Sequence, residues 1–394
     1  MFTNGYIIYR LLVITKLTDT FVFWSLEKSR GRVNRICLYI IMVTALLSFF
    51  IPNAVTVLIL LPILKTIEQD IVSQTDGISL STALTLSVIY GANIGGMGSL
   101  IGSPANLLMI GALDLYSVPG REQISFFSWF LWSVPLVTLF AGAAWILIAT
   151  MAVPKQAKSI TIQLEGAANH GPVPPEQKAG ALLFFFFLFF WIGESVLKEA
   201  VPVFESAESP VCLSFFALFL YFAFIRLGPA AAPLLHPKDM ITGVPKRGIL
   251  FLGLLVLLIL IVRFFRLDKQ AADVLLSVIS PDIPLFAMTF LTVITVIFLT
   301  ELLSNTVVST AFFPIAFYVS IGRGISPLFL MIAVSIASTC AFMSPVATPC
   351  NALAFGEMKG TSFRKMVVLG SMLNLIGAFL MSVWLQFIIP FIYH

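Results

Sequence analysis

Charged side chains are scarce in this chain: Asp, Glu, Lys and Arg together make up only 11% of its 394 residues. Soluble domains carry roughly 25% charged residues, so the composition excludes a water-soluble globular protein. Apolar residues reach 59%, and the mean hydropathy is +1.01. Repeated apolar segments of membrane-spanning length therefore predict an all-α integral membrane protein that crosses the lipid bilayer of the cell membrane several times.

Histidine and cysteine are also rare, with three and four residues respectively. The histidines are scattered and no two cysteines form a CxxC pair, so the sequence predicts neither a metal cluster nor a disulfide. It also contains no phosphate loop and no pattern typical of a nucleophile and its base, so we expect no enzyme and no organic cofactor. The net charge of +4 comes from Lys and Arg between apolar segments, so we expect no nucleic-acid partner. The cysteines are Cys37, Cys212, Cys340 and Cys350.

Four of the apolar segments are interrupted by Gly, Pro, Asn and Ser, which end helices and cap new ones. The apolar segments lie at about 5–24, 36–66, 81–116, 126–153, 180–200, 210–226, 248–265, 284–320, 326–356 and 366–391. The interruptions read "FFIPNAV" at 49–55, "NIGGMGSLIGSPAN" at 93–106, "LLSNTVV" at 302–308 and "AFMSPVATPCN" at 341–351. They predict two re-entrant helical hairpins and two broken helices.

The interruptions occur in two matching sets. Asn53 and Asn305 are 252 residues apart, as are Pro62 and Pro314, and "GSPAN" at 102–106 matches "ATPCN" at 347–351. This spacing predicts an internal repeat. We expect a first repeat over 1–153, with a scaffold helix at 5–24, a hairpin at 36–66, a broken helix at 81–116 and a closing helix at 126–153. After a cytoplasmic linker at 154–179, the second repeat covers 180–394, with scaffold helices within 180–265, a hairpin at 284–320, a broken helix at 326–356 and a closing helix at 366–391.

Positive charge predicts the orientation in the membrane. If each hairpin enters and leaves the membrane on the same face, one side of the membrane holds the loops at 24–35, 65–80, 153–179, 226–247 and 356–365. These loops hold fifteen Lys and Arg, against six on the opposite side. By the positive-inside rule the first set is cytoplasmic, and the two hairpins then enter from opposite sides, so we expect the repeats to be inverted.

A break at membrane depth leaves one helix end with free carbonyls and the next with free N–H groups. Carbonyls with an Asn or Ser oxygen suit a small hard cation such as Na⁺, and N–H ends attract an anion. None of the four breaks contains a basic residue. Two other interpretations remain open here: Gly91, Gly95 and Gly98 also suit close helix packing. Glu301 suits either a proton carrier or an orienting group that accepts backbone N–H bonds.

Several motifs resemble the divalent anion:sodium symporter family of the ion transporter superfamily. The segment "SNTVVSTAFFP" at 304–314 resembles its Ser-Asn-Thr signature, and "MSPVATPCNALAFG" at 343–356 is similar to its second-repeat motif. "NIGGMGSLIGSPANLLMIGA" at 93–112 resembles the first-repeat counterpart. The resemblance covers nearly the whole chain. It implies an elevator-type secondary transporter, usually a homodimer, that carries dicarboxylates, citrate or sulfate with Na⁺.

The resemblance also implies site residues. One Na⁺ would lie among Ser48, the Pro52 backbone, Asn53 and the Gly102 backbone. The other would lie among Thr300, the Leu303 backbone, Asn305 and the Ala347 backbone. The anion would meet Asn53, Ser103, Ser304, Asn305, Thr306, Thr348 and Pro349.

Two departures from the family pattern keep alternatives open. The first Ser-Asn-Thr copy reads "PNA" at 52–54, which removes two hydroxyls and weakens the first cation site. Coupling to H⁺, or export of a metalloid oxyanion as in other members of the superfamily, therefore stays an alternative. The first repeat also has one scaffold helix where the second has three, so we expect it to lack N-terminal helices. A truncated, non-transporting membrane subunit is the alternative from another functional class.

Overall fold

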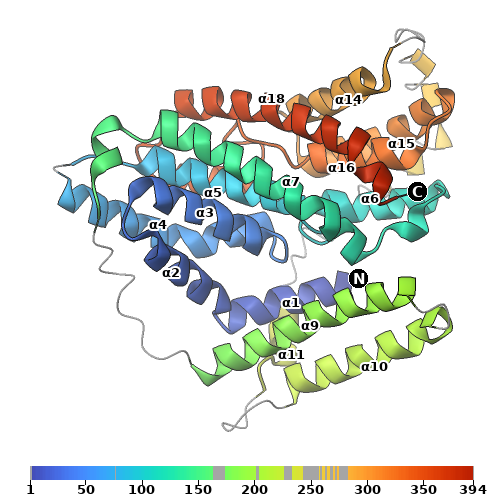
Figure 1. Ribbon diagram of the computed structural model, residues 1–394, viewed down its shortest axis with the longest axis horizontal. Coiled ribbons are helices and arrows are strands. Elements are labelled where there is room, and N and C mark those ends of the chain that lie inside the picture. Colours follow the sequence, from blue (N-terminus) through green and yellow to red (C-terminus); the bar gives the residue numbers. More distant parts are fainter. Residues whose placement is uncertain are drawn as a thin grey trace.

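The computed structural model describes residues 2–75, 77–162, 174–200, 204–225, 233–242 and 283–393, and separate positions between 257 and 274. Within these residues the chain is helical and contains no β-sheet, and a single bridge pairs Arg32 with Thr161 (Figure 1). Three of the described helices are long and apolar enough to cross a membrane, namely Phe126–Ala152, Asn305–Gly322 and Phe363–Phe391. The prediction of an all-α protein with several membrane-length helices is confirmed.

The N-terminal segment forms two helices, α1 (Phe2–Ile14) and α2 (Leu17–Ser29), and the expected single helix over 5–24 is wrong. The Thr15 hydroxyl donates to the Leu11 carbonyl at 2.7 Å, within the last turn of α1. Lys16 then adopts a left-handed conformation with φ of 53°. That conformation ends a helix, and neither residue is a type that marks a break in a sequence.

The first hairpin and the first broken helix have their interruptions within 49–55 and 93–106. The helices are α3 (Val33–Ser48), α4 (Asn53–Gln74), α5 (Ser81–Gly96) and α6 (Pro104–Leu115). The α4 helix runs well past the expected end of the apolar segment at residue 66. Its extension is amphipathic: Ile67 and Ile71 lie one turn apart and are buried, while Gln69 is exposed. The Glu68 carboxylate accepts the Leu80 N–H just ahead of α5. Burial of one face is enough to continue a helix.

The rest of the chain supplies the closing helices and the second set of interruptions. The first closing segment is α7 (Phe126–Leu147), continued by a π-helical turn (Ile148–Ala152). The later helices are α9 (Pro175–Ala200), α10 (Phe204–Phe224), α11 (Pro237–Thr242), α14 (Leu285–Thr300), α15 (Asn305–Gly322), α16 (Pro327–Ala337), α17 (Pro349–Glu357) and α18 (Phe363–Phe387). Most of the scaffold helix expected at 248–265, and much of the loop at 226–247, lies outside the described residues.

The centre of the protein is built around α5 and α16, whose residues are almost all buried. Helices that are apolar on every side are buried on every side. The α3 helix packs closely on α5, because a Cβ on Gly91 would lie 2.7 Å from the Ile41 carbonyl oxygen, and one on Gly95 would overlap the Ala45 backbone. The packing interpretation of these two glycines is therefore confirmed. Figure 1 shows α9 and α10 as a separate layer beside α1, on the opposite side from α14 and α18.

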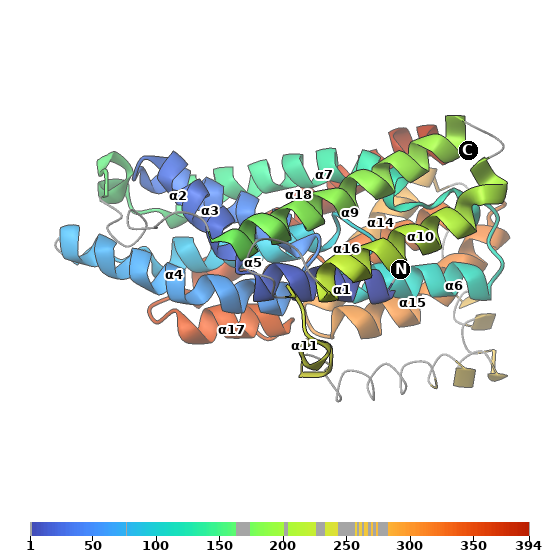
Figure 2. The ribbon, with the colours of Figure 1, turned by 90° about the horizontal axis from the view of Figure 1, so that it is seen from below.

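The two halves of the sequence interleave. The α6 helix packs on α15 and α16 of the second half, whereas α17 of the second half packs on α4 and α5 of the first. Figure 2 shows α17 alongside α4, and α6 beside α15. Each broken helix thus inserts its second part between elements of the other half, which brings the four interruptions into one region.

The proposed orientation can be tested by cysteine labelling. We expect Arg30→Cys and Lys238→Cys to resist a membrane-impermeant thiol reagent added to intact cells, because their loops carry eight Lys and Arg between them. Both variants are made in a protein that also carries Cys212→Ser, because Cys212 is partly exposed whereas the other native cysteines are buried. Both positions should become labelled after the cells are lysed, and rapid labelling in intact cells would contradict the orientation.

Candidate ion- and anion-binding site

Four helices begin at the interruptions, each directly after a Pro, Ser or Thr. The residues that precede them are Pro52 before α4, Ser103 before α6, Ser304 before α15 and Thr348 before α17. The Ser103 hydroxyl accepts the Ala105 N–H at 3.3 Å, and the Thr348 hydroxyl accepts the Asn351 N–H at 3.2 Å. Both α6 and α17 have Pro at their first position, which has no N–H to satisfy. The remaining N–H groups give each helix start a partial positive charge suited to an anion.

Two buried asparagines hold the broken helices in the same way. Asn106 donates to the carbonyls of Gly96 and Ser99 at 3.0 and 2.7 Å, and Asn351 donates to those of Ala341 and Ser344 at 2.9 and 2.8 Å. In each case the carbonyls lie ten and seven residues before the asparagine. An asparagine therefore closes the equivalent loop in each half of the sequence.

Each of these asparagines is held in turn by a side chain from the other half. The Ser335 hydroxyl donates to Asn106 Oδ1 at 2.8 Å, and Asn93 Nδ2 donates to Asn351 Oδ1 at 2.9 Å. The sequence motifs do not single out Asn93 or Ser335. The repeat between "GSPAN" and "ATPCN" places Asn106 and Asn351 at matching positions, which is a sequence signal for their shared role. Asn93 and Ser335 belong to no matched pair.

Glu301 orients the second broken helix. Its buried carboxylate accepts the backbone N–H groups of Phe342, Met343 and Ser344 at 2.6, 2.8 and 2.9 Å, and Asn374 Nδ2 at 2.8 Å. The orienting interpretation of this residue thus agrees with its contacts. The four N–H donors are the partners that a buried carboxylate needs.

Among the described residues, no carboxylate contacts the first break in this way. Phe49 takes the matching position, immediately after the end of α3, and its ring lies against Gly98 in the first break. Trp129 and Ser133 of α7 donate to the Met97 and Gly98 carbonyls at 3.0 and 2.7 Å. The α7 helix therefore holds the first break through its carbonyls, whereas Glu301 holds the second through its N–H groups.

The residues of the first predicted cation site lie close together. A Cβ on Gly102 would lie 2.9 Å from the Ser48 carbonyl oxygen, and one on Gly96 would lie 3.1 Å from the Asn53 amide nitrogen. Ser48 Oγ and Asn53 Oδ1 are buried without a hydrogen-bond partner, as is Thr56 Oγ1 one turn along α4. Unpaired buried oxygens are costly, and hydroxyl and amide oxygens are ligands that suit a hard cation such as Na⁺. The Pro52 carbonyl is already used, because it accepts the Val55 and Thr56 N–H groups at 2.8 and 3.1 Å.

The second predicted cation site also gathers oxygens. The Thr300 hydroxyl lies 2.6 Å from Asn305 Oδ1 and 2.9 Å from the Ser338 carbonyl oxygen. One hydroxyl hydrogen serves both acceptors, so three oxygens surround a single proton, an arrangement that a small cation also satisfies. Leu303, at the tip between α14 and α15, is exposed, and Ala347 is buried beside the start of α17.

The predicted anion contacts lie at the surface of this region and just beneath it. Ser304 and Pro349 are exposed, Asn305 and Thr306 are half-buried, and Ser103 and Thr348 are buried. Asn93 is hydrogen-bonded to both Asn53 and Asn351 and so connects the first hairpin to the second break. Among the described residues no hydrogen bond joins Asn53 to Asn305.

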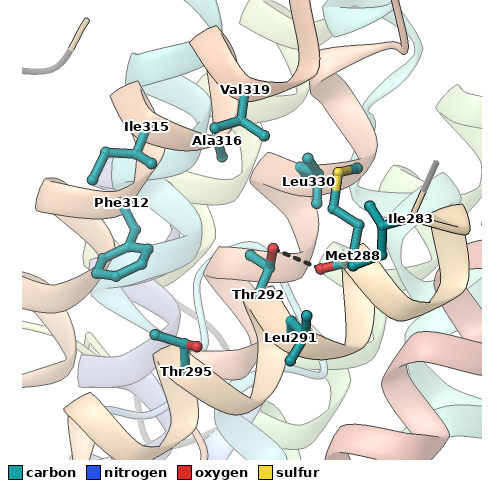
Figure 3. Close-up of a pocket in the computed structure, with 10 residues that line it drawn as sticks. All are labelled: Ile283, Met288, Leu291, Thr292, Thr295, Phe312, Ile315, Ala316, Val319 and Leu330. Atoms are coloured by element: carbon teal, nitrogen blue, oxygen red, sulfur yellow. Dashed lines mark hydrogen bonds between the residues drawn. The ribbon is translucent and has the colours of Figure 1, made fainter. Parts of the chain in front are cut away.

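A cavity of about 120 Å³ lies between α14, α15 and α16, and it does not suit an anion (Figure 3). Its lining is apolar except for two threonines, and the Thr292 hydroxyl already donates to the Met288 carbonyl at 2.9 Å. Leu291, Phe312 and Leu330 are among the apolar side chains that face the cavity. The four helix starts, and not this cavity, are therefore the candidate site.

The chain is similar to proteins that are named as transporters of citrate and dicarboxylates. The family model described as "Citrate transporter" (CitMHS) matches residues 1–320. The sodium-dependent dicarboxylate transporter SdcS of Staphylococcus saprophyticus is 31% identical over 378 residues, which cover 91% of this chain and 70% of that protein. The sodium-dependent high-affinity dicarboxylate transporter 3 of Caenorhabditis elegans is 28% identical over 352 residues, which cover 80% of this chain and 61% of that protein.

The sodium-dependent dicarboxylate transporter SdcS of Staphylococcus aureus (strain MRSA252) is 27% identical over 409 residues, which cover the whole chain and 76% of that protein. The chain thus spans between 61% and 76% of the length of these relatives. The resemblance to the divalent anion:sodium symporters is confirmed. With four interrupted helices of matched design and a family match over most of its length, the chain belongs to the citrate transporter family of multi-pass membrane proteins and is not an enzyme.

Proposed function

We propose that this protein is a Na⁺-coupled symporter of a small di- or tricarboxylate. The observation that carries the proposal is the cluster of unpaired buried oxygens, Ser48 Oγ and Asn53 Oδ1, at a helix start that belongs to a set of four. Relatives are named as sodium-dependent dicarboxylate transporters and the family as citrate transporters, which supports both the ion and the substrate class.

The chemistry of the site accounts for the coupling. No Lys or Arg occurs in the four interruptions, so helix N-termini are the only fixed positive charge there. A dicarboxylate brings two negative charges, and partial helix charges balance them incompletely. Cations bound beside the helix starts, at Ser48 and Asn53 and at Thr300 and Asn305, would complete the balance. Substrate and Na⁺ would thus each bind better in the presence of the other.

The mode of transport is also part of the proposal. The interleaved helices α3–α6 and α14–α17 would move as one body against the layer that contains α1, α9 and α10, as in an elevator. Exposed apolar side chains on that layer, such as Leu182, Phe189 and Leu213, suit contact with lipid or with a second copy of the chain. We propose a homodimer in the cell membrane, with the loops at 24–35 and 226–247 on the cytoplasmic side.

The test is uptake of labelled anions into proteoliposomes that contain the purified chain. We expect an inward Na⁺ gradient to drive uptake of succinate or citrate, and K⁺ to be unable to replace Na⁺. Sulfate and arsenite provide the comparison anions. Uptake or efflux that follows a pH gradient without Na⁺ would favour the proton-coupled or oxyanion alternative, and absence of counterflow for every anion would favour a non-transporting subunit.

A restored first motif should increase Na⁺ affinity. In Pro52→Ser/Ala54→Thr two hydroxyls return beside Asn53, and each added contact to a partly desolvated ion or carboxylate contributes roughly 1–3 kcal/mol. We therefore expect the Na⁺ concentration for half-maximal uptake to fall at least severalfold. Pro52→Ala/Ala54→Val, which changes the same positions without adding hydroxyls, is the control and should leave that concentration unchanged. If the restored variant loses transport while the parent works without Na⁺, then "PNA" serves another coupling ion.

A further inference from the structure

Asn93 lies in the last turn of α5, completely buried, and its side chain uses all its hydrogen-bonding capacity. Its Nδ2 donates to the Ala341 carbonyl at 2.8 Å and to Asn351 Oδ1 at 2.9 Å. Its Oδ1 accepts from Cys350 Sγ at 3.4 Å and, at the long distance of 3.5 Å, from Asn53 Nδ2. An amide has two N–H donors and two acceptor positions, so none is left over.

The orientations of three amides follow from one another. Asn351 Nδ2 donates to two backbone carbonyls, which only accept, so Asn351 Oδ1 must face Asn93. Asn93 must then present Nδ2 to Asn351 and to the Ala341 carbonyl, which leaves its Oδ1 for the amide of Asn53. Asn53 therefore donates through Nδ2, and its Oδ1 is the atom left without a partner.

We propose that Asn93 is a positioning residue for the first cation site: it holds the Asn53 amide so that Oδ1, and not Nδ2, faces the ion. This inference rests on the proposed Na⁺-coupled function. A cation on Asn53 Oδ1 polarises the amide and makes its N–H a stronger donor to Asn93. Ion binding in the first half would then tighten the contact chain that ends at Asn351, inside the broken helix of the second half.

The prediction concerns Na⁺ affinity more than maximal rate. In Asn93→Ala the Asn53 amide is free to rotate, so we expect about a tenfold higher Na⁺ concentration for half-maximal succinate uptake, equivalent to about 1.4 kcal/mol. At saturating Na⁺ the maximal rate and the succinate concentration for half-maximal uptake should stay within about twofold of the parent. Equilibrium binding of ²²Na⁺ to the purified protein should weaken in parallel. Asn93→Ser, which preserves a small polar side chain, serves if Asn93→Ala does not fold.

Ser335→Ala is the matched control. Ser335 is equally buried and also donates across the interface between the halves, to Asn106 Oδ1, but it makes no bond to a hairpin tip. We expect it to leave the half-saturating Na⁺ concentration within about twofold of the parent. An equal shift in Ser335→Ala would mean that Asn93 acts only through general packing, and would overturn the inference.

A double-variant cycle tests whether Asn93 acts through Asn53. Asn53→Ser keeps an oxygen for the ion but has no amide to orient, so adding Asn93→Ala to it should cause no further shift in Na⁺ affinity. Independent, multiplying shifts would overturn the inference. If the parent shows neither Na⁺-dependent uptake nor ²²Na⁺ binding, the proposed function itself fails. If the parent shows both and Asn93→Ala leaves the Na⁺ affinity unchanged, only the role of Asn93 fails.

Discussion

Glu301→Gln is expected to lower the initial rate of Na⁺-driven uptake at least a hundredfold. The carboxylate accepts three backbone N–H groups and the Asn374 amide, all at 2.9 Å or less. Gln has a single acceptor oxygen and points its own N–H₂ toward a donor. With its oxygen at the Oε1 position, Gln loses the bond to the Ser344 N–H, and its three other bonds are no longer charge-assisted. Together these changes cost about 3 kcal/mol or more, which corresponds to a factor above one hundred. The uptake assay with labelled succinate measures the rate, and thermal unfolding of the purified protein measures the lost stability.

Glu357→Gln is the matched control for this charge change. Glu357 is exposed and pairs with Lys65 at 2.6 Å at the surface, where an ion pair contributes little. We expect it to transport at the parent rate. A different result would restore the proton-carrier interpretation of Glu301: retained Na⁺-driven uptake in Glu301→Gln together with loss of all pH dependence would mean that this carboxylate moves protons and does not hold the break.

Gly95→Ala should strongly destabilise the packing of α3 on α5. The three atoms nearest to the added Cβ all belong to the Ala45 backbone, so no side-chain rotation can relieve the clash and α3 must separate from α5. Overpacking of this kind costs typically 1–3 kcal/mol, and more where only backbone can move. The same shift would pull Ser48 away from Gly102. We therefore expect a clear drop in unfolding temperature and an even larger proportional loss of uptake.

Gly142→Ala, in the middle of α7, provides the comparison. A Cβ there has no neighbour within 4 Å, and Ala favours a helix by about 1 kcal/mol over Gly. Its unfolding temperature should equal or exceed that of the parent. Equal destabilisation by the two substitutions would contradict the close packing of α3 on α5.

The positions of the interruptions were predictable from the sequence, because their residues act locally. Pro52 determines the start of α4 through its restricted backbone, and Ser103 and Thr348 determine those of α6 and α17 through side-chain capping. Neither effect depends on distant contacts. The assignment to the integral membrane proteins was predictable from composition alone, because a chain with so few charged residues cannot cover its surface with groups that interact with water.

The turn at Lys16 and the length of α4 were not predictable in the same way. Lys16 has no intrinsic preference for a left-handed conformation, and the polar extension of α4 is helical because Ile67 and Ile71 find a surface to pack on. The amide contacts of Asn93 depend on residues roughly two-thirds of the chain away, which local patterns do not connect. The helix starts within each half were therefore predictable from the sequence, whereas the hydrogen bonds between the halves were not.

The bonds of Asn93 also impose an order on biogenesis. Its partners Ala341 and Asn351 follow it by 248 and 258 residues. At about 5–20 residues per second, a ribosome needs on the order of 10–50 s to synthesise that stretch. Throughout this interval α5 exists without α16 and α17, and the amide of Asn93 must be satisfied by water or by the insertion machinery. The buried helix α5 thus reaches its final surroundings only after the C-terminal part of the chain has been synthesised.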